Sequence, residues 1–299
     1  MNPQPLQSED FISTAVLPFS IIKEHNLDLN EYYDLLTANY PHPDDPTLVP
    51  YYLKLVGQKV YSFFPSFTAF IVTPLYIVPA YMGYDQSIEG IRILSRLSGA
   101  FVTSLSVAIF WFILKKSVED KKKRVFLLLI YALATNSLSI SSQGLWQHGT
   151  SQLFNGLGLL STLLGFFGLS GFAFGLSTIA RPTNLLSLVV FAVLIFYKTR
   201  KPKTVIKYLT FSAIPLIWEV AVDTYTYGSI FNTGYGNHNR WTANIIEGFI
   251  GIWLSPSKGL LITTPVLIFA LYGIYKVLQN PSKRKVNTAL AAIIFLHTL

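Results

Sequence analysis

Basic side chains in this chain are concentrated in three short clusters, and long apolar stretches separate the clusters. Fifteen of the 23 Lys and Arg residues lie within residues 115–124, 198–207 and 276–285. Short loops rich in Lys and Arg stay on the cytoplasmic side of a membrane. The pattern therefore predicts a polytopic membrane protein in which all three clusters face the cytoplasm. The other eight basic residues and 13 of the 15 acids are then expected on the opposite side.

The overall composition agrees with a membrane location and argues against nucleic-acid binding. The mean hydropathy is +0.44, 51% of the residues are hydrophobic and only 13% are charged, which is far from the usage of soluble proteins. The net charge of +8 does not indicate nucleic acid, because the basic residues lie at the ends of apolar stretches. We therefore expect a lipid bilayer as partner and no nucleic acid.

The residue types exclude thiol chemistry and offer no metal site. The chain has no cysteine, so neither a disulfide nor a thiol nucleophile is expected. The five histidines are scattered singly and form no set with metal-ligand spacing. We expect no cofactor, and the question of a divalent metal stays open.

The apolar pattern predicts an all-α, polytopic transmembrane helical bundle of about seven to nine membrane segments. We expect a single membrane domain over residues 1–299. Residues 1–96 are expected to form an extracytoplasmic loop with juxtamembrane helices, and residues 97–299 the transmembrane bundle. Within the loop, residues 65–84 are apolar but carry three prolines, which favours an interfacial or re-entrant piece over a clean span.

Two parts of the span pattern need a further interpretation. Between residues 151 and 198 the chain crosses either as three short segments that turn near Gly168 and Arg181, or as one span with a re-entrant pair. The 14 residues 286–299 are too few to cross ~30 Å of hydrocarbon. No apolar span precedes the polar N-terminal segment, so we expect the chain to be truncated at both ends.

Two groups of polar residues in the expected outer loops are candidates for chemistry. Glu9 and Asp10 could supply a general base or hold an acceptor hydroxyl, and the alternative is a solvated acidic turn. Trp146, Gln147 and His148 follow an outward helix that is already polar. They concentrate hydrogen-bonding groups at the membrane edge, which is typical of a site, and the alternative is an interfacial Trp beside a solvated His.

Arg181 interrupts a long apolar run, where an Arg costs at least ~2.5 kcal/mol and needs a partner. The partner could be an anionic phosphate, a structural carboxylate such as Glu219, or lipid headgroups reached by the long side chain. Lys258 could neutralise a phosphate or lie at the lipid headgroups. Arg240 lies in a loop of turn residues and aromatics that predicts either a substrate loop or a plain surface loop.

These residues, taken in order, resemble the superfamily of polytopic membrane glycosyltransferases called GT-C, which includes the protein O-mannosyltransferases and bacterial proteins of family 39 type. The resemblance rests on an acidic first-loop motif, a proline-rich juxtamembrane segment, a polar loop and a glycine-rich helix that ends in Arg-Pro-Thr-Asn. In this chain those four motifs are Ser8–Phe11, Tyr61–Phe67, Ser142–Gly149 and Gly171–Asn184.

The resemblance implies transfer of a sugar from a polyprenyl-phosphate-linked donor to a lipid, glycan or protein acceptor on the extracytoplasmic face. It implies a bacterial plasma membrane protein in which Asp10, with Glu9 second, activates the acceptor while basic groups stabilise the departing phosphate. One position departs from the family pattern: Phe63 stands where a Lys is frequent, so phosphate binding passes to Lys59, Arg181 or Lys258, or is not done at all. The rival interpretations are a membrane transporter or lipid flippase without covalent chemistry, and a non-catalytic GT-C relative.

Overall fold

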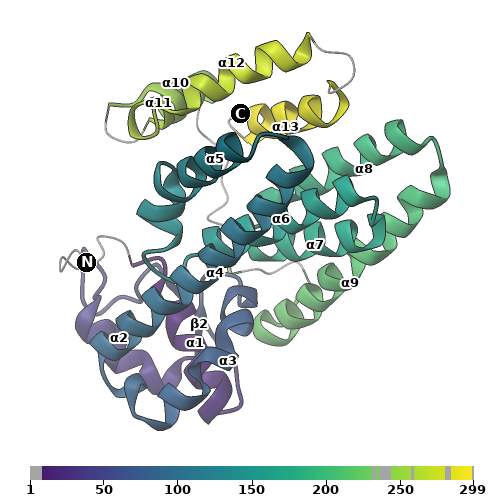
Figure 1. Ribbon diagram of the computed structural model, residues 1–299. Helices are drawn as coiled ribbons and strands as arrows, with labels where there is room; N and C mark the ends of the chain where they lie inside the picture. Colours follow the sequence, from purple (N-terminus) through teal and green to yellow (C-terminus); the bar gives the residue numbers. More distant parts are fainter. Residues whose placement is uncertain (1–8, 231–233, 236–243, 257–258, 280–283, 298–299) are drawn as a thin grey trace.

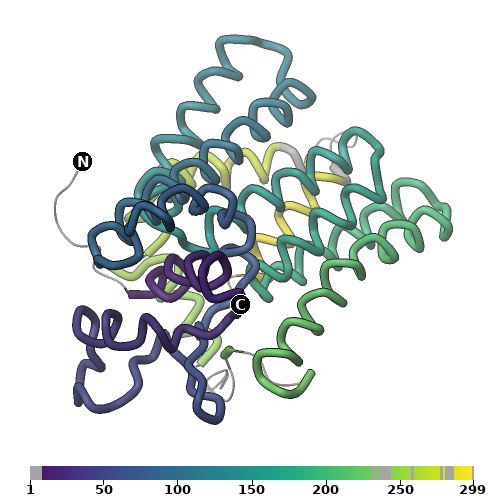
Figure 2. Tube along the Cα trace, turned by 90° about the horizontal axis from the view of Figure 1, so that it is seen from below, coloured from purple at the N-terminus to yellow at the C-terminus, as the bar shows by residue number. Residues whose placement is uncertain are grey.

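The computed structural model shows a mostly helical protein (75% helix) with one small β-hairpin (Figure 1). An N-terminal subdomain, residues 9–87, lies against one end of a helical bundle that the rest of the chain forms (Figures 1 and 2). The expected helical architecture is therefore confirmed in its main part. The structure describes residues 9–230, 234–235, 244–256, 259–279 and 284–297.

The N-terminal subdomain has its own core, although a polar loop was expected there. Nine consecutive residues of its first helix, Ile12 to Ser20, are buried. This short helix is therefore stabilised by tertiary packing and not by its intrinsic helix propensity. The hairpin pairs Leu53 with Ser62 and turns at Gly57, whose φ of +64° suits glycine. The elements are α1 (Ile12–Lys23), α2 (Tyr33–Asn39), β1 (Leu53–Val56), β2 (Lys59–Ser62) and α3 (Phe67–Tyr81).

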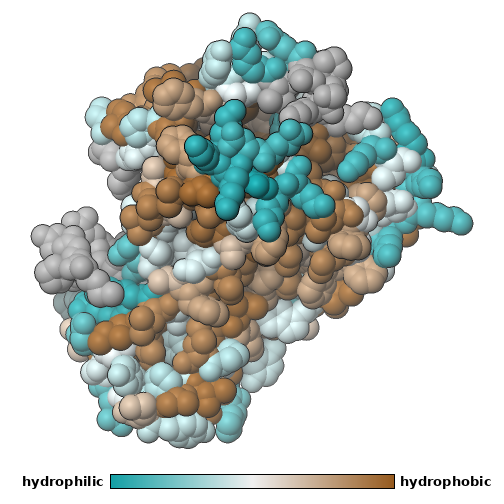
Figure 3. Space-filling model, viewed as in Figure 1, coloured by the Kyte–Doolittle hydropathy of each residue, from teal (hydrophilic) through white to brown (hydrophobic). Residues whose placement is uncertain are grey.

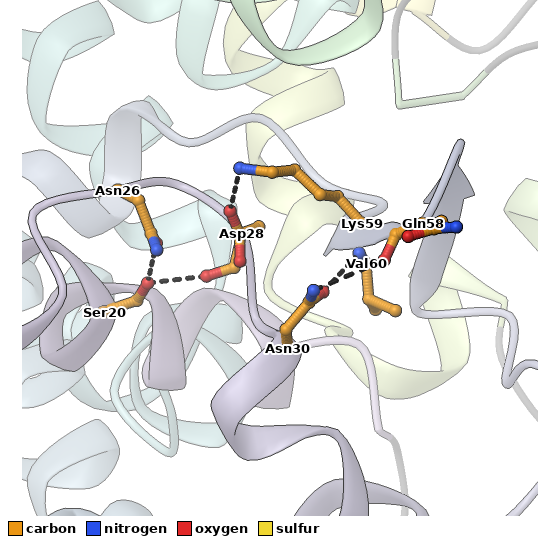
Figure 4. A network of polar contacts seen from close by, with 7 residues as sticks. All are labelled: Ser20, Asn26, Asp28, Asn30, Gln58, Lys59 and Val60. Carbon is orange, nitrogen blue, oxygen red and sulfur yellow. Dashed lines mark hydrogen bonds and ion pairs between the residues drawn. The ribbon is translucent and has the colours of Figure 1, made fainter.

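Polar side chains tie the segment after α1 to the hairpin (Figure 4). The Lys59 Nζ atom lies 2.8 Å from Oδ2 of Asp28, whose side chain is 4% exposed. The Asn30 side chain accepts a hydrogen bond from the Val60 backbone N–H at 2.8 Å. The Ser20 hydroxyl contacts the Asp28 carbonyl at 2.5 Å and the Asn26 side chain at 2.6 Å. These contacts hold the expected outer loop in one conformation.

The apolar segment with three prolines forms one helix. Pro74 and Pro79 lie inside α3 without ending it, and its 15 residues pack mainly on α1 and the adjoining chain. The next helix, α4 (Ile88–Ser117), is longer than the span that the sequence predicts from residue 97. It begins at Ser87, whose side chain accepts a hydrogen bond from the Gly90 N–H, so residues 88–96 are helical rather than a loop.

Helix α5 (Lys121–Leu133) returns from the first basic cluster and is followed by a short π-helix, Ser137–Ser141. The ambiguous stretch then forms three helices, α6 (Gln147–Leu164), α7 (Phe167–Ala180) and α8 (Leu185–Thr199). They are joined by turns at Gly165, three residues before the expected position, and at Arg181. Three helices over residues 151–198 agree with the interpretation of three short segments. How many of these helices cross a membrane stays a prediction.

Helix α9 (Pro202–Tyr227) packs closely against α7. A Cβ atom at Gly171 would overlap the Tyr208 carbonyl, and one at Gly175 would overlap Ser212 and Pro215, so this glycine pair lets the two backbones approach. The apolar stretch 260–275 is divided between two helices. The remaining helices are α10 (Ile245–Leu254), α11 (Leu260–Thr263), α12 (Leu267–Leu278) and α13 (Arg284–His297).

Among the described residues, three helical segments are long and apolar enough to cross a membrane. They are Ile88–Ser117, Pro182–Thr199 and Pro202–Tyr227. The α4–α5 and α8–α9 turns, which carry two of the basic clusters, both lie away from the N-terminal subdomain (Figures 1 and 2). Figure 3 shows these turns as hydrophilic patches on a surface that is largely hydrophobic over the helices. Both features are compatible with a membrane protein.

Candidate functional site

Four of the predicted site residues lie near one another where the N-terminal subdomain meets the bundle. We call Asp10, Gln147, His148, Arg181 and Tyr235 the junction cluster. Arg181 lies in the turn after α7, and its Nη1 atom is 2.5 Å from Nδ1 of His148 at the start of α6. Because a guanidinium has only donors, Nδ1 must accept and the neutral imidazole carries its proton on Nε2.

The surroundings of His148 keep its imidazole neutral. The residue lies in the first turn of α6, outside the three candidate spans. Burial, reinforced by the positive charge of Arg181, lowers the pKa of His148 to about 4, and Asp10 acts weakly in the opposite sense. His148 is therefore an acceptor that orients the guanidinium near neutral pH.

Glu9 and Asp10 lie in the turn before α1, where the Ile12 N–H donates to the Glu9 carbonyl, rather than in the expected extended segment, and their side chains have different environments. Asp10 accepts a hydrogen bond from the Tyr51 hydroxyl at 2.6 Å, and its charge acts on His148 and Tyr235. The charge of Glu9 instead adds to burial in raising the pKa of Tyr52. Burial, together with the charge of Asp10, raises the pKa of Glu9 itself. Asp10 is thus the carboxylate that belongs to the junction cluster.

Trp146, which lies beside this cluster, and Gln147, which belongs to it, each present an unused hydrogen-bond donor. The Trp146 ring lies 5.8 Å from the Phe11 ring and 6.2 Å from the His148 ring. Its Nε1 atom and the Nε2 atom of Gln147 are buried, and neither has a partner among the described residues. The Gln147 carbonyl oxygen is occupied, because it accepts a hydrogen bond from the Tyr235 hydroxyl at 3.2 Å. Buried donors without partners are costly, so this corner favours a ligand rich in oxygen.

The other predicted site residues lie elsewhere. Lys59 is part of the hairpin and pairs with Asp28 (Figure 4). Phe63 packs against the Phe64 and Tyr235 rings, so it borders the junction cluster without a charge. No ion pair between Arg181 and Glu219 occurs among the described side chains. Arg240 and Lys258 lie outside the described residues.

A cavity of about 250 Å³ adjoins the junction cluster. Its walls come from the juxtamembrane segment, from the turn around Arg181 and from α9, and Tyr235 belongs to both the cavity and the cluster. We call it the α9 cavity. Sequence reasoning missed this cavity and the role of Asp223 in it, and it considered Glu219 only as a possible structural partner of Arg181. Their spacing of four residues within an apolar helix was the available signal, since it places both on one helix face.

Comparison with known protein families, with curated proteins and with solved structures gives no match to this chain. Within the described part of the chain, no group of three or more His, Asp or Glu side chains could hold a metal ion. The chemistry of the site therefore has to be argued from the junction cluster itself. It combines one carboxylate, one guanidinium held by a neutral imidazole, and two unused N–H donors.

Proposed function

We propose that the protein transfers a sugar from a polyprenyl-phosphate-linked donor to an acceptor on the extracytoplasmic face of a bacterial plasma membrane. The observation that carries the proposal is that Arg181 contacts His148 and that the charge of Asp10, far away in the sequence, also acts on His148, next to unused donors. A sugar phosphate is rich in oxygen acceptors and carries an anion, so both features suit it.

Each residue then has a distinct role. Asp10 accepts the proton of the acceptor hydroxyl or amine, whose heavy atom forms a bond to the anomeric carbon of the sugar. The bond between that carbon and the donor phosphate breaks, and the phosphate leaves with the electron pair. Arg181 stabilises the departing charge, and neutral His148 positions the guanidinium. Trp146 Nε1 and Gln147 Nε2 are available to hold the sugar hydroxyls.

A second candidate is a transporter or lipid flippase without covalent chemistry. It is favoured by the two acids on α9, because Glu219 and Asp223 lie on a candidate span and line the α9 cavity. Ionisable residues within spans frequently mark substrate or ion pathways. The two candidates differ in the product: a transferase makes a new glycosidic bond, whereas a flippase only moves the lipid.

The test measures transfer of radiolabelled sugar from polyprenyl phosphate to the acceptor pool in membranes that carry the full chain. Asp10→Asn keeps the shape of the side chain but removes the base, so we expect turnover to fall by roughly 10²-fold or more with donor binding retained. Arg181→Ala should abolish transfer and weaken donor binding. The transfer rate of Arg181→Lys should lie between those of the wild type and Arg181→Ala, because lysine keeps the charge but lacks the planar guanidinium.

Asp34→Asn is the matched control, since Asp34 is an exposed acid in α2. Full transfer by Asp10→Asn and by Arg181→Ala at normal expression would refute the catalytic assignment. Movement of labelled lipid across a liposome membrane, with no new glycoside formed by the wild type, would favour the flippase.

A further inference from the structure

The α9 cavity contains two carboxylates and no lining cation among the described residues. Glu219 and Asp223 are one helical turn apart on α9, and both face the cavity. The Lys54 ammonium is near enough to Asp223 to interact with its charge and lies 4.6 Å from the centre of the Tyr227 ring. Arg181 is held by His148. The charge of the acid pair is thus compensated mainly on the Asp223 side.

Glu219 is the acid for which the described chain supplies no partner. Its Oε2 atom is buried and makes no hydrogen bond among the described residues. The Ser66 hydroxyl, which also lines the cavity, is buried and makes no hydrogen bond among the described residues either. A buried carboxylate oxygen without a partner is costly. The cavity therefore presents two free acceptors to any ligand that carries several N–H donors.

The walls of the cavity distinguish an organic cation from a metal ion. They include the rings of Tyr61, Tyr227 and Tyr235. The Tyr227 hydroxyl donates to the Ser62 carbonyl at 3.0 Å and the Tyr235 hydroxyl donates to Gln147, so these two tyrosines offer mainly ring surface. Hard divalent cations need several oxygen ligands, which two acids on one helix among apolar side chains do not supply. Carboxylates beside aromatic rings suit an ammonium group.

We propose that the α9 cavity binds a primary ammonium group, with Glu219 and the Ser66 hydroxyl as acceptors and the tyrosine rings as walls. A primary ammonium has three N–H donors, which these acceptors can satisfy. Because Tyr235 connects the cavity to the junction cluster, the ammonium belongs to the substrate of that cluster. This last step rests on the proposed transfer reaction. The amine itself could be carried by a lipid headgroup or by a sugar.

Binding to the purified full chain in detergent tests the proposal by titration calorimetry, which needs no turnover. Glycerophosphoethanolamine represents the lipid source, and glycerophosphocholine, which lacks N–H donors, is its control. Glucosamine represents the sugar source, with N-acetylglucosamine as control. We expect at least one amine to bind tenfold or more tightly than its control, and the amine that does so identifies the source.

Glu219→Gln should remove most of this preference, whereas Glu119→Gln, at an exposed turn after α4, should keep it. Equal binding of each amine and its control by the wild type would overturn the proposal, as would an unchanged preference in Glu219→Gln. The wild-type comparison decides the matter even where a variant does not fold. Selective amine binding by a wild-type protein that forms no glycoside would refute the transfer reaction and retain the ammonium site.

Discussion

The N-terminal subdomain and the helical bundle bury their side chains in different ways. Helix α1 buries nine consecutive residues on all its faces, whereas α9 has 26 residues and buries only five of them. The core around α1 is closed, although the end of α3 exposes Val78 and Tyr81. The bundle exposes large apolar side chains such as Phe126, Ile217 and Phe269, which a bilayer would cover.

The polar contacts follow the same division. In the subdomain, ion pairs join distant segments, as in Lys23 to Asp85 at 2.6 Å and Lys59 to Asp28 at 2.8 Å. In the bundle, uncharged side chains join the helices: the Asn184 amide contacts the Ser151 hydroxyl at 2.6 Å, and Gly171 lets α7 approach α9. Small residues and neutral hydrogen bonds are typical of helices that pack in lipid. The site lies where these two kinds of structure meet.

The largest expected effect is all-or-none labelling of cysteines placed in the two regions. The chain has no cysteine of its own, and Asp44 and Lys201 are both exposed. An impermeant thiol reagent added to intact cells should label Asp44→Cys and miss Lys201→Cys, because the basic α8–α9 turn is expected in the cytoplasm. Equal labelling of the two positions in intact cells, with labelling of both after lysis as the control, would contradict the orientation.

The next effect compares one side-chain type in the two regions. Phe19 in α1 is 0% exposed, and Phe126 in α5 is 64% exposed. Phe19→Ala leaves a cavity in the subdomain core and should lower the free energy of unfolding by about 3–5 kcal/mol. Phe126→Ala should change it little. Thermal unfolding of both variants in detergent measures the contrast, and similar losses would mean that the two regions share one type of core.

At the boundary of the regions, His148 should make stability depend on pH. Below pH 6.5 the unfolded chain takes up a proton at this imidazole, while the folded chain, in which the pKa of His148 is about 4, does not. The free energy of unfolding should therefore fall between pH 6.5 and 4, by up to about 3 kcal/mol.

Melting curves at pH 7.5, 5.5 and 4.5 measure this dependence. His148→Gln should remove it, and His42→Gln, in the turn after α2, should not. A pH profile that is identical in the wild type and in His148→Gln would show that the imidazole is not held neutral.

The smallest expected effect concerns the close packing of the bundle. Gly171→Ala places a Cβ atom against the Tyr208 carbonyl and should destabilise the protein by about 1–3 kcal/mol. Gly273→Ala in α12 meets open space and should be neutral or slightly stabilising, since alanine favours helix. If the two substitutions gave the same melting temperature, the α7–α9 contact would contribute nothing to stability.

Part of the site was predictable from local patterns, since Arg181 in an apolar run and the cluster Trp146 to His148 both stand out in the sequence. The partner of Arg181 was not predictable, because a guanidinium can donate to any nearby oxygen or nitrogen acceptor and the sequence offers several. The structure places His148 there rather than Glu219. The hairpin and the buried α1 were also missed, because prolines and short polar runs within residues 1–64 are equally typical of loops.

The sequence by itself determined that the chain is mostly helical and has apolar segments suited to a membrane, because these properties depend on the order of residues along single segments. Only the tertiary structure decided which residues meet. Tyr235 contacts Gln147 across 88 positions and Tyr51 contacts Asp10 across 41. Such contacts depend on how separate elements pack, and periodicity within one element contains no information about its distance from another.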